Sequence, residues 1–490
     1  MLQQLDTADS VRREVAPRIA QKRKSELGQF MTPSSVARFM AGMFPPSTLQ
    51  TCRLLDAGAG VGALSCAFLD RWLTGGFGFK TVVATAYEVD ETLRGHLMQH
   101  LGSYSKVKAE VIGGDYIELA TAEDLQAKGY THTILNPPYK KINSNSAHRL
   151  ALRSVGIETV NLYSAFVALA VAQAAPGGQI VAIIPRSFCN GPYYRPFRDF
   201  ILERTAIRHM HLFESRNKAF KDDEVLQENV IIRLERGGQQ GSVTITTSTD
   251  DSFTDLVTHE HPFDRIVFPD DTERFIHVPT TTEKSTIELS PAVRYTLADL
   301  GIKVSTGPVV DFRLREHLRE MPEDGTVPLV YPGHLSITGT MWPVPGLKKP
   351  NAILRNEATE KWLYPNGFYC VVRRFSSKEE KRRVVASVVE PTAFGDHTVL
   401  GFENHINLFH ENKRGLPELL ARGLVVFLNT TAVDESFRRF NGHTQVNATD
   451  LKLMKYPSRE ALIELGKWVI RQHSEITQDM IDEQLGKLAA

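Results

Sequence analysis

The chain has 490 residues, and its 57 lysines and arginines are balanced by 57 aspartates and glutamates, so its formal net charge is zero. This length predicts about two or three domains with a sizeable core. The balanced charge neither favours nor excludes a nucleic-acid partner, and any basic surface must be local. The polar start of the chain and the lack of any apolar run of about 18 residues argue against a secretory signal and a membrane span. The four scattered cysteines lack the spacing of a metal site and fit a reduced, cytoplasmic protein.

The segment at residues 27–33 reads Leu-Gly-Gln-Phe-Met-Thr-Pro. Thr32 followed by Pro33 is typical of a helix start, with the threonine as N-cap and the proline in the first turn. The free N–H groups of such a helix start can receive a ligand carboxylate. Thr32 is therefore a candidate cofactor-binding residue.

A glycine-rich turn follows the next predicted strand, at residues 54–62 with the sequence Leu-Leu-Asp-Ala-Gly-Ala-Gly-Val-Gly. Asp56 stands at the end of the strand, and the glycines at 58, 60 and 62 allow a positive φ and let a ligand lie against the backbone. The spacing differs from the phosphate fingerprint G-x-G-x-x-G, and no Lys-Ser or Lys-Thr follows. Asp56, Gly58 and Gly60 therefore predict a pocket for a nucleoside without phosphate.

Two further acids follow strand-like segments. Glu88 ends a predicted strand at residues 81–87, at the distance from the glycine turn where a ribose-binding carboxylate sits in such folds. Asp115 follows two glycines and can accept a hydrogen bond from an adenine amino group. Each acid alone is more often a solvated strand end, but the three motifs in this order predict a nucleoside pocket.

Residues 136–139 read Asn-Pro-Pro-Tyr and follow an apolar run at residues 133–135. Pro137 and Pro138 cannot donate to a sheet, so the run reads as a buried strand that stops in a stiff loop. Open α/β sheets bind ligands at such strand ends. There, Asn136 Oδ1 and the carbonyl of Pro137 can accept the two N–H bonds of a planar amine, and Tyr139 can stack on the attached ring. The alternative is an ordinary Pro-Pro turn with a surface tyrosine.

Strands and helices alternate through the first half of the chain. We expect an apolar helix at residues 161–175 that ends at Pro-Gly-Gly, then a buried strand at 179–184, and two later strands at 209–214 and 228–234. The alternation predicts an α/β fold with a doubly wound, mostly parallel sheet, whose last strands can form an antiparallel hairpin. A Gly-Gly-Gln-Gln-Gly linker at residues 237–241 predicts the end of this domain.

The second half of the chain has short β-type segments and then helices. It carries basic–aromatic clusters at residues 311–315, 371–375 and 437–440. Any one of them is usually a solvated face, but three together predict a surface that follows a phosphate backbone. The predicted division is 1–240, a connecting segment at 241–284, and 285–490.

In their order, these motifs resemble the N6-adenine DNA methyltransferases of restriction–modification systems. Residues 27–37 are similar to the N-terminal motif of that family, 56–62 to its glycine-rich AdoMet motif, and 136–139 to its catalytic motif. Glu88 and Asp115 match its ribose and adenine contacts. The resemblance implies a Rossmann-like AdoMet-dependent methyltransferase sheet at 1–240 and an α+β target-recognition domain at 285–490.

The resemblance extends to the DNA-binding parts of the family. Phe220 resembles the second aromatic that sandwiches the flipped base with Tyr139. Arg373 and Arg374, with the segments at 403–405 and 441–447, look like the recognition domain of type II methylases of the PstI and BsuBI kind, which implies CTGCAG sites. The resemblance also implies double-stranded DNA as substrate, a separate restriction endonuclease as partner and action as a monomer.

The family chemistry needs alignment of amine, methyl and sulfur, with no metal and no strong general base. Enzymes that methylate a glutamine side chain in translation release factors share the Asn-Pro-Pro-Tyr motif, and an RNA-adenine methylase is another alternative. A nucleic-acid-binding module with a degenerate AdoMet fold is a third. The basic–aromatic second half favours DNA over the glutamine substrate.

Overall fold

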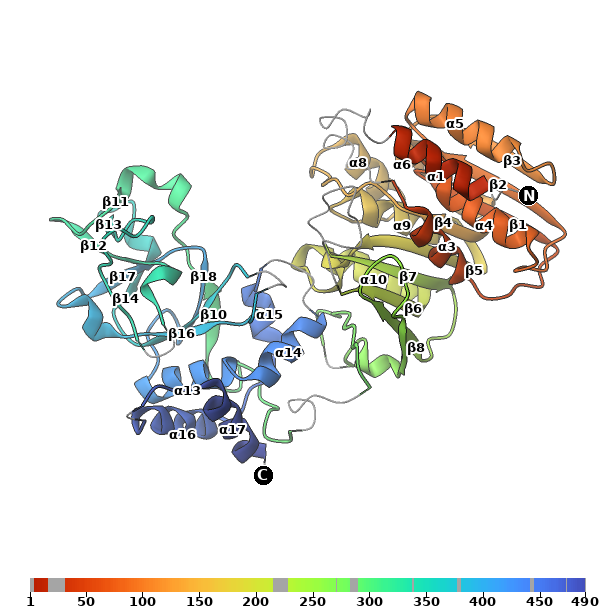
Figure 1. Cartoon of the computed structure of the whole chain (residues 1–490). Coiled ribbons are helices and arrows are strands. Elements are labelled where there is room, and N and C mark those ends of the chain that lie inside the picture. Colours follow the sequence, from red (N-terminus) through yellow and green to blue (C-terminus); the bar gives the residue numbers. More distant parts are fainter. Residues whose placement is uncertain are drawn as a thin grey trace. The chain divides into compact units, whose positions relative to one another are not determined.

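The computed structural model describes residues 4–15, 31–214, 228–269, 271–282, 290–336, 339–376, 380–440, 445–472 and 474–489. The chain divides into two compact units, Met1–Thr282 and Glu283–Ala490 (Figure 1). Each unit has its own sheets and helices. The segment at 241–284, which we expected to connect two domains, lies almost entirely within the first unit.

A nine-stranded sheet forms the centre of the first unit, in the order β3-β2-β1-β4-β5-β7-β6-β8-β9. Strands β3, β2, β1, β4 and β5 are parallel to one another, and β7 runs antiparallel between β5 and β6. This confirms the expected α/β fold and its antiparallel hairpin. The strands are β1 (Thr51–Ala57), β2 (Thr81–Tyr87), β3 (Val107–Ile112), β4 (Tyr130–Leu135), β5 (Ala174–Pro185), β6 (Thr205–Phe213), β7 (Asn229–Arg236), β8 (Val243–Ser248) and β9 (Val257–His261).

Helices cover both faces of this sheet, and each face has its own apolar core. Along β5, Ile180 and Ala182 face one core while Val181 and Ile183 face the other, as the two-residue period of a strand requires. One core packs against α1 (Gln4–Val15), α3 (Ser34–Gly42), α4 (Ala63–Leu73) and α5 (Glu91–Gly102). The other packs against α6 (Tyr116–Thr121), α7 (Leu125–Lys128), α8 (Ala147–Ser154), α9 (Leu162–Gln173) and α10 (Arg195–Arg204).

The Pro-Gly-Gly segment after α9 differs from its prediction. It does not end the helix before a loop but lies inside β5, which begins at Ala174. The pairing of β4 with β5 shifts register between Tyr130 and His132, which marks a bulge. A side chain at Gly178 would lie 2.9 Å from the carbonyl oxygen of Tyr130, so only glycine lets the two strands approach here.

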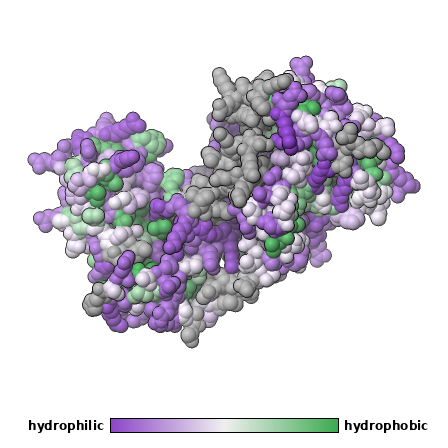
Figure 2. Space-filling model, viewed as in Figure 1, coloured by the Kyte–Doolittle hydropathy of each residue, from purple (hydrophilic) through white to green (hydrophobic). Residues whose placement is uncertain are grey.

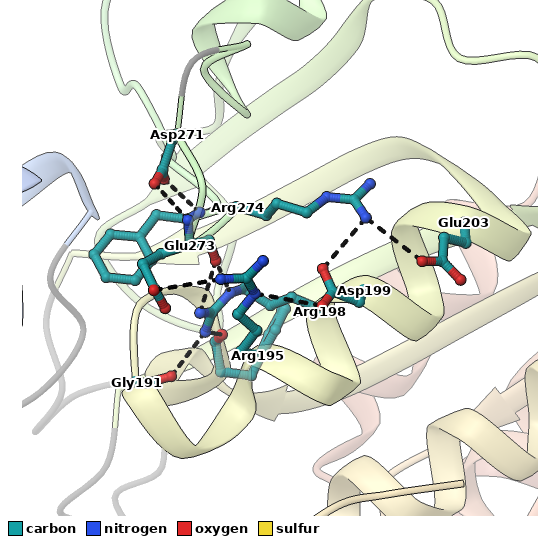
Figure 3. Close-up of polar contacts among 10 residues, drawn as sticks. Gly191, Arg195, Arg198, Asp199, Glu203, Asp271, Glu273 and Arg274 are labelled. Carbon is teal, nitrogen blue, oxygen red and sulfur yellow. Dashed lines mark hydrogen bonds and ion pairs between the residues drawn. The ribbon is translucent and has the colours of Figure 1, made fainter. Parts of the chain in front are cut away.

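A buried arginine attaches residues 271–275 to the first unit (Figure 3). Arg198 donates to the carbonyls of Phe188 and Gly191 at 2.9 and 2.8 Å, and to the carbonyl of Glu273 at 2.9 Å. Burial lowers the pKa of Arg198 to about 10. Arg195 and Arg274 add ion pairs around it, to acids of α10 and of the 271–275 segment. Residues 241–282 therefore fold with the first unit, through β8, β9 and this cluster.

The second unit combines two small sheets with a helical end. One sheet has the order β10-β18-β15-β16 and the other β11-β13-β12-β17-β14. Their strands are β10 (Lys303–Thr306), β11 (Leu318–Arg319), β12 (Thr326–Val330), β13 (Ala352–Leu354), β14 (Leu363–Pro365), β15 (Tyr369–Arg373), β16 (Ala386–Val389), β17 (Val399–Phe402) and β18 (Ile406–His410). The helices are α13 (Glu418–Leu428), α14 (Thr431–Phe440), α15 (Ala448–Leu453), α16 (Arg459–Ile470) and α17 (Gln478–Ala489).

Two glycines set the packing of α13 on α16. A Cβ at Gly423 would lie 1.7 Å from the carbonyl oxygen of Leu462, and one at Gly466 would lie 1.9 Å from that of Leu419. The two helix backbones therefore touch, which any larger residue would prevent. This contact holds the helical end of the second unit together.

Polar residues cover most of the visible surface of both units (Figure 2), and apolar side chains appear there in scattered groups. Among the helices that the structure describes, none is long and apolar enough to cross a membrane.

Candidate active site

A cavity of about 310 Å³ lies where several parallel strands end. Open α/β sheets bind ligands at this edge, outside the carboxyl ends of the strands. β1, β2 and β4 each deliver one of the sequence motifs here. The cavity is lined by Gly58, Glu88, Asp115, Asn136, Pro138 and Phe166, among others. The structure thus gathers residues from five segments that are far apart in the sequence.

The glycine turn after β1 takes the backbone conformation that its sequence predicts. Gly58, Gly60 and Gly62 have φ values of +75°, +57° and +90°, which L side chains rarely adopt. The backbone N–H of Gly58 donates to the carbonyl of Tyr87 at 2.9 Å, so the turn is held against the end of β2. A side chain at Gly58 would contact Phe166 and Pro138, which border the cavity.

Asp56 lies beneath this turn and does not line the cavity. Its side chain is fully buried, and Oδ2 accepts from the hydroxyl of Ser65 at 2.7 Å and from the Ser65 backbone N–H at 3.2 Å. Burial raises the pKa of Asp56 to about 7, against the lowering effect of the Ser65 hydrogen bonds. The structure therefore places Asp56 as a support for the start of α4.

Exchanging Asp56 for asparagine should stabilise the protein more at about pH 8 than at about pH 5. The pKa of Asp56 is about 7 in the folded chain against an ordinary 3.8. The stability given by its protonated form is therefore fully present below about pH 4 and is lost as the pH rises through about 7. Asparagine carries no charge at any pH. The midpoint of thermal unfolding, followed by circular dichroism, should rise with the substitution at the higher pH, and an equal change at both pH values would contradict this.

Glu88 fastens the glycine turn to the end of β2. Its Oε2 accepts from the backbone N–H of Gly60 at 2.7 Å, and its Oε1 accepts from that of Asp90 at 2.8 Å. The side chain is buried and borders the cavity. A carboxylate fixed by two backbone donors is well oriented toward further donors on a ligand.

Asp115 caps α6 and meets a histidine that sequence reasoning missed. Its Oδ1 accepts from the backbone N–H groups of Ile117 and Glu118 at 2.9 and 3.1 Å. Its Oδ2 lies 3.0 Å from Nε2 of His148 on α8. His148 also lines the cavity. The serine N-cap of α8, Ser146, is the local signal that could have predicted this helix beside the site.

Asn136 follows β4 and is held from both sides of its amide. Nδ2 donates to the hydroxyl of Thr32 at 3.1 Å, and the hydroxyl of Tyr139 donates to Oδ1 at 3.2 Å. Thr32 is not the helix N-cap that we predicted. The N-cap of α3 is Pro33, and the Thr32 hydroxyl accepts from Asn136 instead. Thr32 and Asn136 both line a second, smaller pocket of about 20 Å³.

Tyr139 is more enclosed than a stacking surface was expected to be. Its ring lies edge-on to Tyr163, with centroids 6.2 Å apart, and only 9% of the residue is exposed. Burial raises the pKa of its hydroxyl well above the usual range, so it stays protonated and donates to Asn136. Among the described residues, no donor contacts the carbonyl of Pro137.

Comparison with known proteins identifies the family. The type II methyltransferase M.BsuBI of Bacillus subtilis is 55% identical over 499 residues, covering 100% of this chain and 98% of that protein. The chain belongs to the type II DNA methyltransferases of restriction–modification systems. M.PstI of Providencia stuartii is 44% identical and covers 97% of this methyltransferase and 95% of its own length. The family that the sequence resembles is thereby confirmed.

Two further comparisons agree with this. The family model described as Eco57I restriction-modification methylase matches residues 92–220, which include Asp115 and the segment 136–139 of this methyltransferase. The solved structure of the type IIL restriction-modification enzyme MmeI in complex with DNA covers 99% of this methyltransferase and 73% of its own chain. The TM-score is 0.50 at 12% identity, so this likeness concerns the fold alone.

Of the three residues that we expected to contact DNA, two belong to the second unit and one falls outside the described residues. Phe220 of this methyltransferase falls outside the described residues. Arg373 forms an ion pair with Glu380. Arg374 donates from its guanidinium to the carbonyl of Asn404 and to Oε1 of Gln445, both at 3.2 Å. In the second unit the two arginines thus hold neighbouring segments together, a role that their sequence context did not indicate.

Proposed function

We propose that this methyltransferase transfers the methyl group of AdoMet to N6 of an adenine flipped out of double-stranded DNA. The observation that carries the proposal is the fixed amide of Asn136, at a strand end, between the cavity and the smaller pocket. Asn136 and Gly58 border both the cavity and the smaller pocket. A group bound in one and a group bound in the other would meet at the amide.

The residues of the cavity fit the nucleoside part of AdoMet. Its volume of about 310 Å³ is that of a small-ligand site. Glu88 would accept from the ribose hydroxyls and Asp115 from the adenine amino group, while Phe166 and Pro138 offer apolar surface to the ring. Thr32 and the glycine turn would hold the methionine end. Asp56 would act through the turn without touching the cofactor. Bound AdoMet supplies an electrophilic methyl group on a positively charged sulfur.

The amino group of adenine is a weak nucleophile because its lone pair is delocalised into the ring. Accepting its two N–H bonds at Asn136 Oδ1 and at the Pro137 carbonyl would localise that pair on nitrogen and aim it at the methyl group. Tyr139 orients Oδ1 and would border the extruded ring, with Phe220 as the second aromatic. Pro138 keeps this loop stiff. These residues supply alignment, which is most of what the reaction needs.

Thr32→Val should slow methyl transfer about two- to tenfold, because it removes the acceptor that fixes Nδ2 of Asn136 and keeps the side-chain shape. Thr32→Ser keeps the hydroxyl and is the matched control. Single-turnover rates with labelled AdoMet measure both. A valine variant as fast as the unaltered protein, or slowing by serine as large as that by valine, would contradict a specific role of the hydroxyl.

The substrate that we propose is a duplex with the sequence CTGCAG, bound by the second unit with help from Arg373 and Arg374. A separate restriction endonuclease would cleave the same sequence, and the methyltransferase would act as a monomer. The test is single-molecule sequencing of DNA from a methylation-free host that expresses this chain. One fully modified adenine in CTGCAG supports the proposal, and modification of another base or of no DNA motif rejects it.

A further inference from the structure

A short segment of the second unit joins its two sheets and carries a pair of titratable side chains. The chain leaves β17, passes through Glu403, Asn404 and His405, and enters β18. The backbone N–H of Glu403 donates to Val330 at 3.1 Å, and that of Asn404 donates to Val309 at 2.9 Å. The segment is therefore fixed to β12 and to Val309, which follows β10 in the chain.

Glu403 and His405 contact each other closely. The carboxylate of Glu403 is fully buried, and both of its oxygens lie 2.6 Å from Nδ1 of His405. It also accepts from the His405 backbone N–H at 2.8 Å. Burial raises the pKa of Glu403. Among the described residues, its side chain has no other hydrogen-bond partner, so His405 alone balances it.

The burial of the Glu403 carboxylate bears on which atoms of Glu403 and His405 carry protons. A buried carboxylate needs a positive partner or a proton of its own. Two arrangements neutralise it, an imidazolium at His405 or a protonated Glu403 that donates to Nδ1, and in both of them Nε2 carries a hydrogen. In a neutral imidazole that donates Nδ1–H to an ionised Glu403, Nε2 is an acceptor, but the buried charge is then not neutralised. Asp311, whose pKa is lowered first by its hydrogen bond from Lys349 and also by His405, adds negative charge nearby. Arg374 donates from its backbone N–H to the carbonyl of His405 and from its guanidinium to the carbonyl of Asn404.

Nε2 of His405 faces away from this carboxylate. The histidine side chain is 36% exposed, and among the described residues no group contacts Nε2. The ring of Phe375 lies against the imidazole, with centroids 4.7 Å apart, and Phe375 is itself 39% exposed. In the neutralised arrangements, the pair therefore presents one oriented N–H donor beside an exposed aromatic ring.

We propose that His405 reads a guanine of the target sequence, with Nε2–H donating to the N7 or O6 acceptor in the major groove. Guanine offers two adjacent acceptors there, whereas the other bases offer a donor, a methyl group or a single acceptor. The affinity of phosphate contacts comes mainly from the full positive charge of Lys and Arg. The buried Glu403 instead offsets the charge of the pair and fixes the ring. Glu403 is therefore the positioning residue. This inference rests on the proposed function.

The test replaces each guanine of the methylated sequence in turn by 7-deazaguanine, which lacks N7, or by 2-aminopurine, which lacks O6. The measured quantity is kcat/KM for methyl transfer. With the unaltered protein, we expect a loss of about tenfold at one guanine. His405→Ala, and His405→Phe, which keeps a ring against Phe375, should react equally with that analogue and with guanine. Glu403→Gln should reduce the discrimination.

His317→Ala is the matched control. His317 also lies beside a glutamate, with Nε2 3.4 Å from Glu316, but that carboxylate is 84% exposed. The control should keep the full loss with the guanine analogue. Its loss of discrimination would show that the effect is not specific to His405.

Other outcomes overturn the inference. If the unaltered protein tolerates every guanine analogue, His405 reads no guanine, and this result needs no variant to fold. If His405→Ala weakens binding of all sequences alike and lowers the salt dependence by about one phosphate contact, His405 binds the backbone. If the unaltered protein methylates no DNA adenine, the proposed function has failed first, which the unmodified duplex alone reveals.

Discussion

Replacing Asn136 with alanine should lower the rate of methyl transfer by about 10³-fold, while the dissociation constants for AdoMet and for duplex DNA change little. The amide is the group that would localise the lone pair of the target nitrogen. It is also fixed in advance by Thr32 and Tyr139, so little reorganisation is needed at the moment of transfer. Removing it leaves the other residues that line the cavity, and the second unit, in place.

Single-turnover kinetics with labelled AdoMet separate this loss from binding, and fluorescence anisotropy of a labelled duplex follows DNA affinity. Asn136→Asp is an informative comparison, because it keeps an oxygen acceptor at the same place but removes the amide donor to Thr32. Its rate should lie between those of the alanine variant and the unaltered protein. An alanine variant that kept a near-normal rate would reject the role of Asn136.

Replacing Glu88 with alanine should weaken AdoMet binding about 100-fold. The carboxylate accepts from two backbone N–H groups, at Gly60 and Asp90, and would accept from the ribose as well. Hydrogen bonds to a charged group contribute about 1.5–3 kcal/mol each. Its loss would therefore both loosen the glycine turn and remove the ribose contact. Isothermal titration with S-adenosylhomocysteine measures the effect without any turnover.

Glu91→Gln is the matched control for Glu88. Glu91 is an exposed acid in the first turn of α5, three residues further along the chain. The Glu91→Gln variant should bind S-adenosylhomocysteine as tightly as the unaltered protein does. Unchanged affinity in the Glu88 variant, or an equal loss in the control, would contradict a specific ribose-binding carboxylate.

The catalytic half could be predicted from local sequence because its motifs are strand ends. A strand followed by glycines with positive φ, an acid after the next strand, and a strand stopped by two prolines each have a local cause. The parallel sheet then gathers them at one edge, which confirms the expected fold. The same local logic explains why β2 was predicted at its observed bounds.

The parts that could not be predicted depend on partners far away in the sequence. Asp56 is predicted to bind the cofactor, and its sequence gives no sign that Ser65 occupies its Oδ2. Residues 241–282 have a linker-like start, but β8 pairs with β6, and Arg198 reaches 75 residues along the chain to Glu273. Arg374 is similar, because its partners at Asn404 and Gln445 lie in other segments. Sequence patterns do not reveal such pairs.

The most direct test of the account uses the purified methyltransferase with trideuteromethyl AdoMet and a duplex containing CTGCAG, beside a duplex with the same bases in another order. Enzymatic digestion and mass spectrometry of the nucleosides then locate the label. We expect trideuterated N6-methyldeoxyadenosine from the CTGCAG duplex and none from the other. Label on cytosine, or no label on DNA from protein that binds AdoMet, would contradict it.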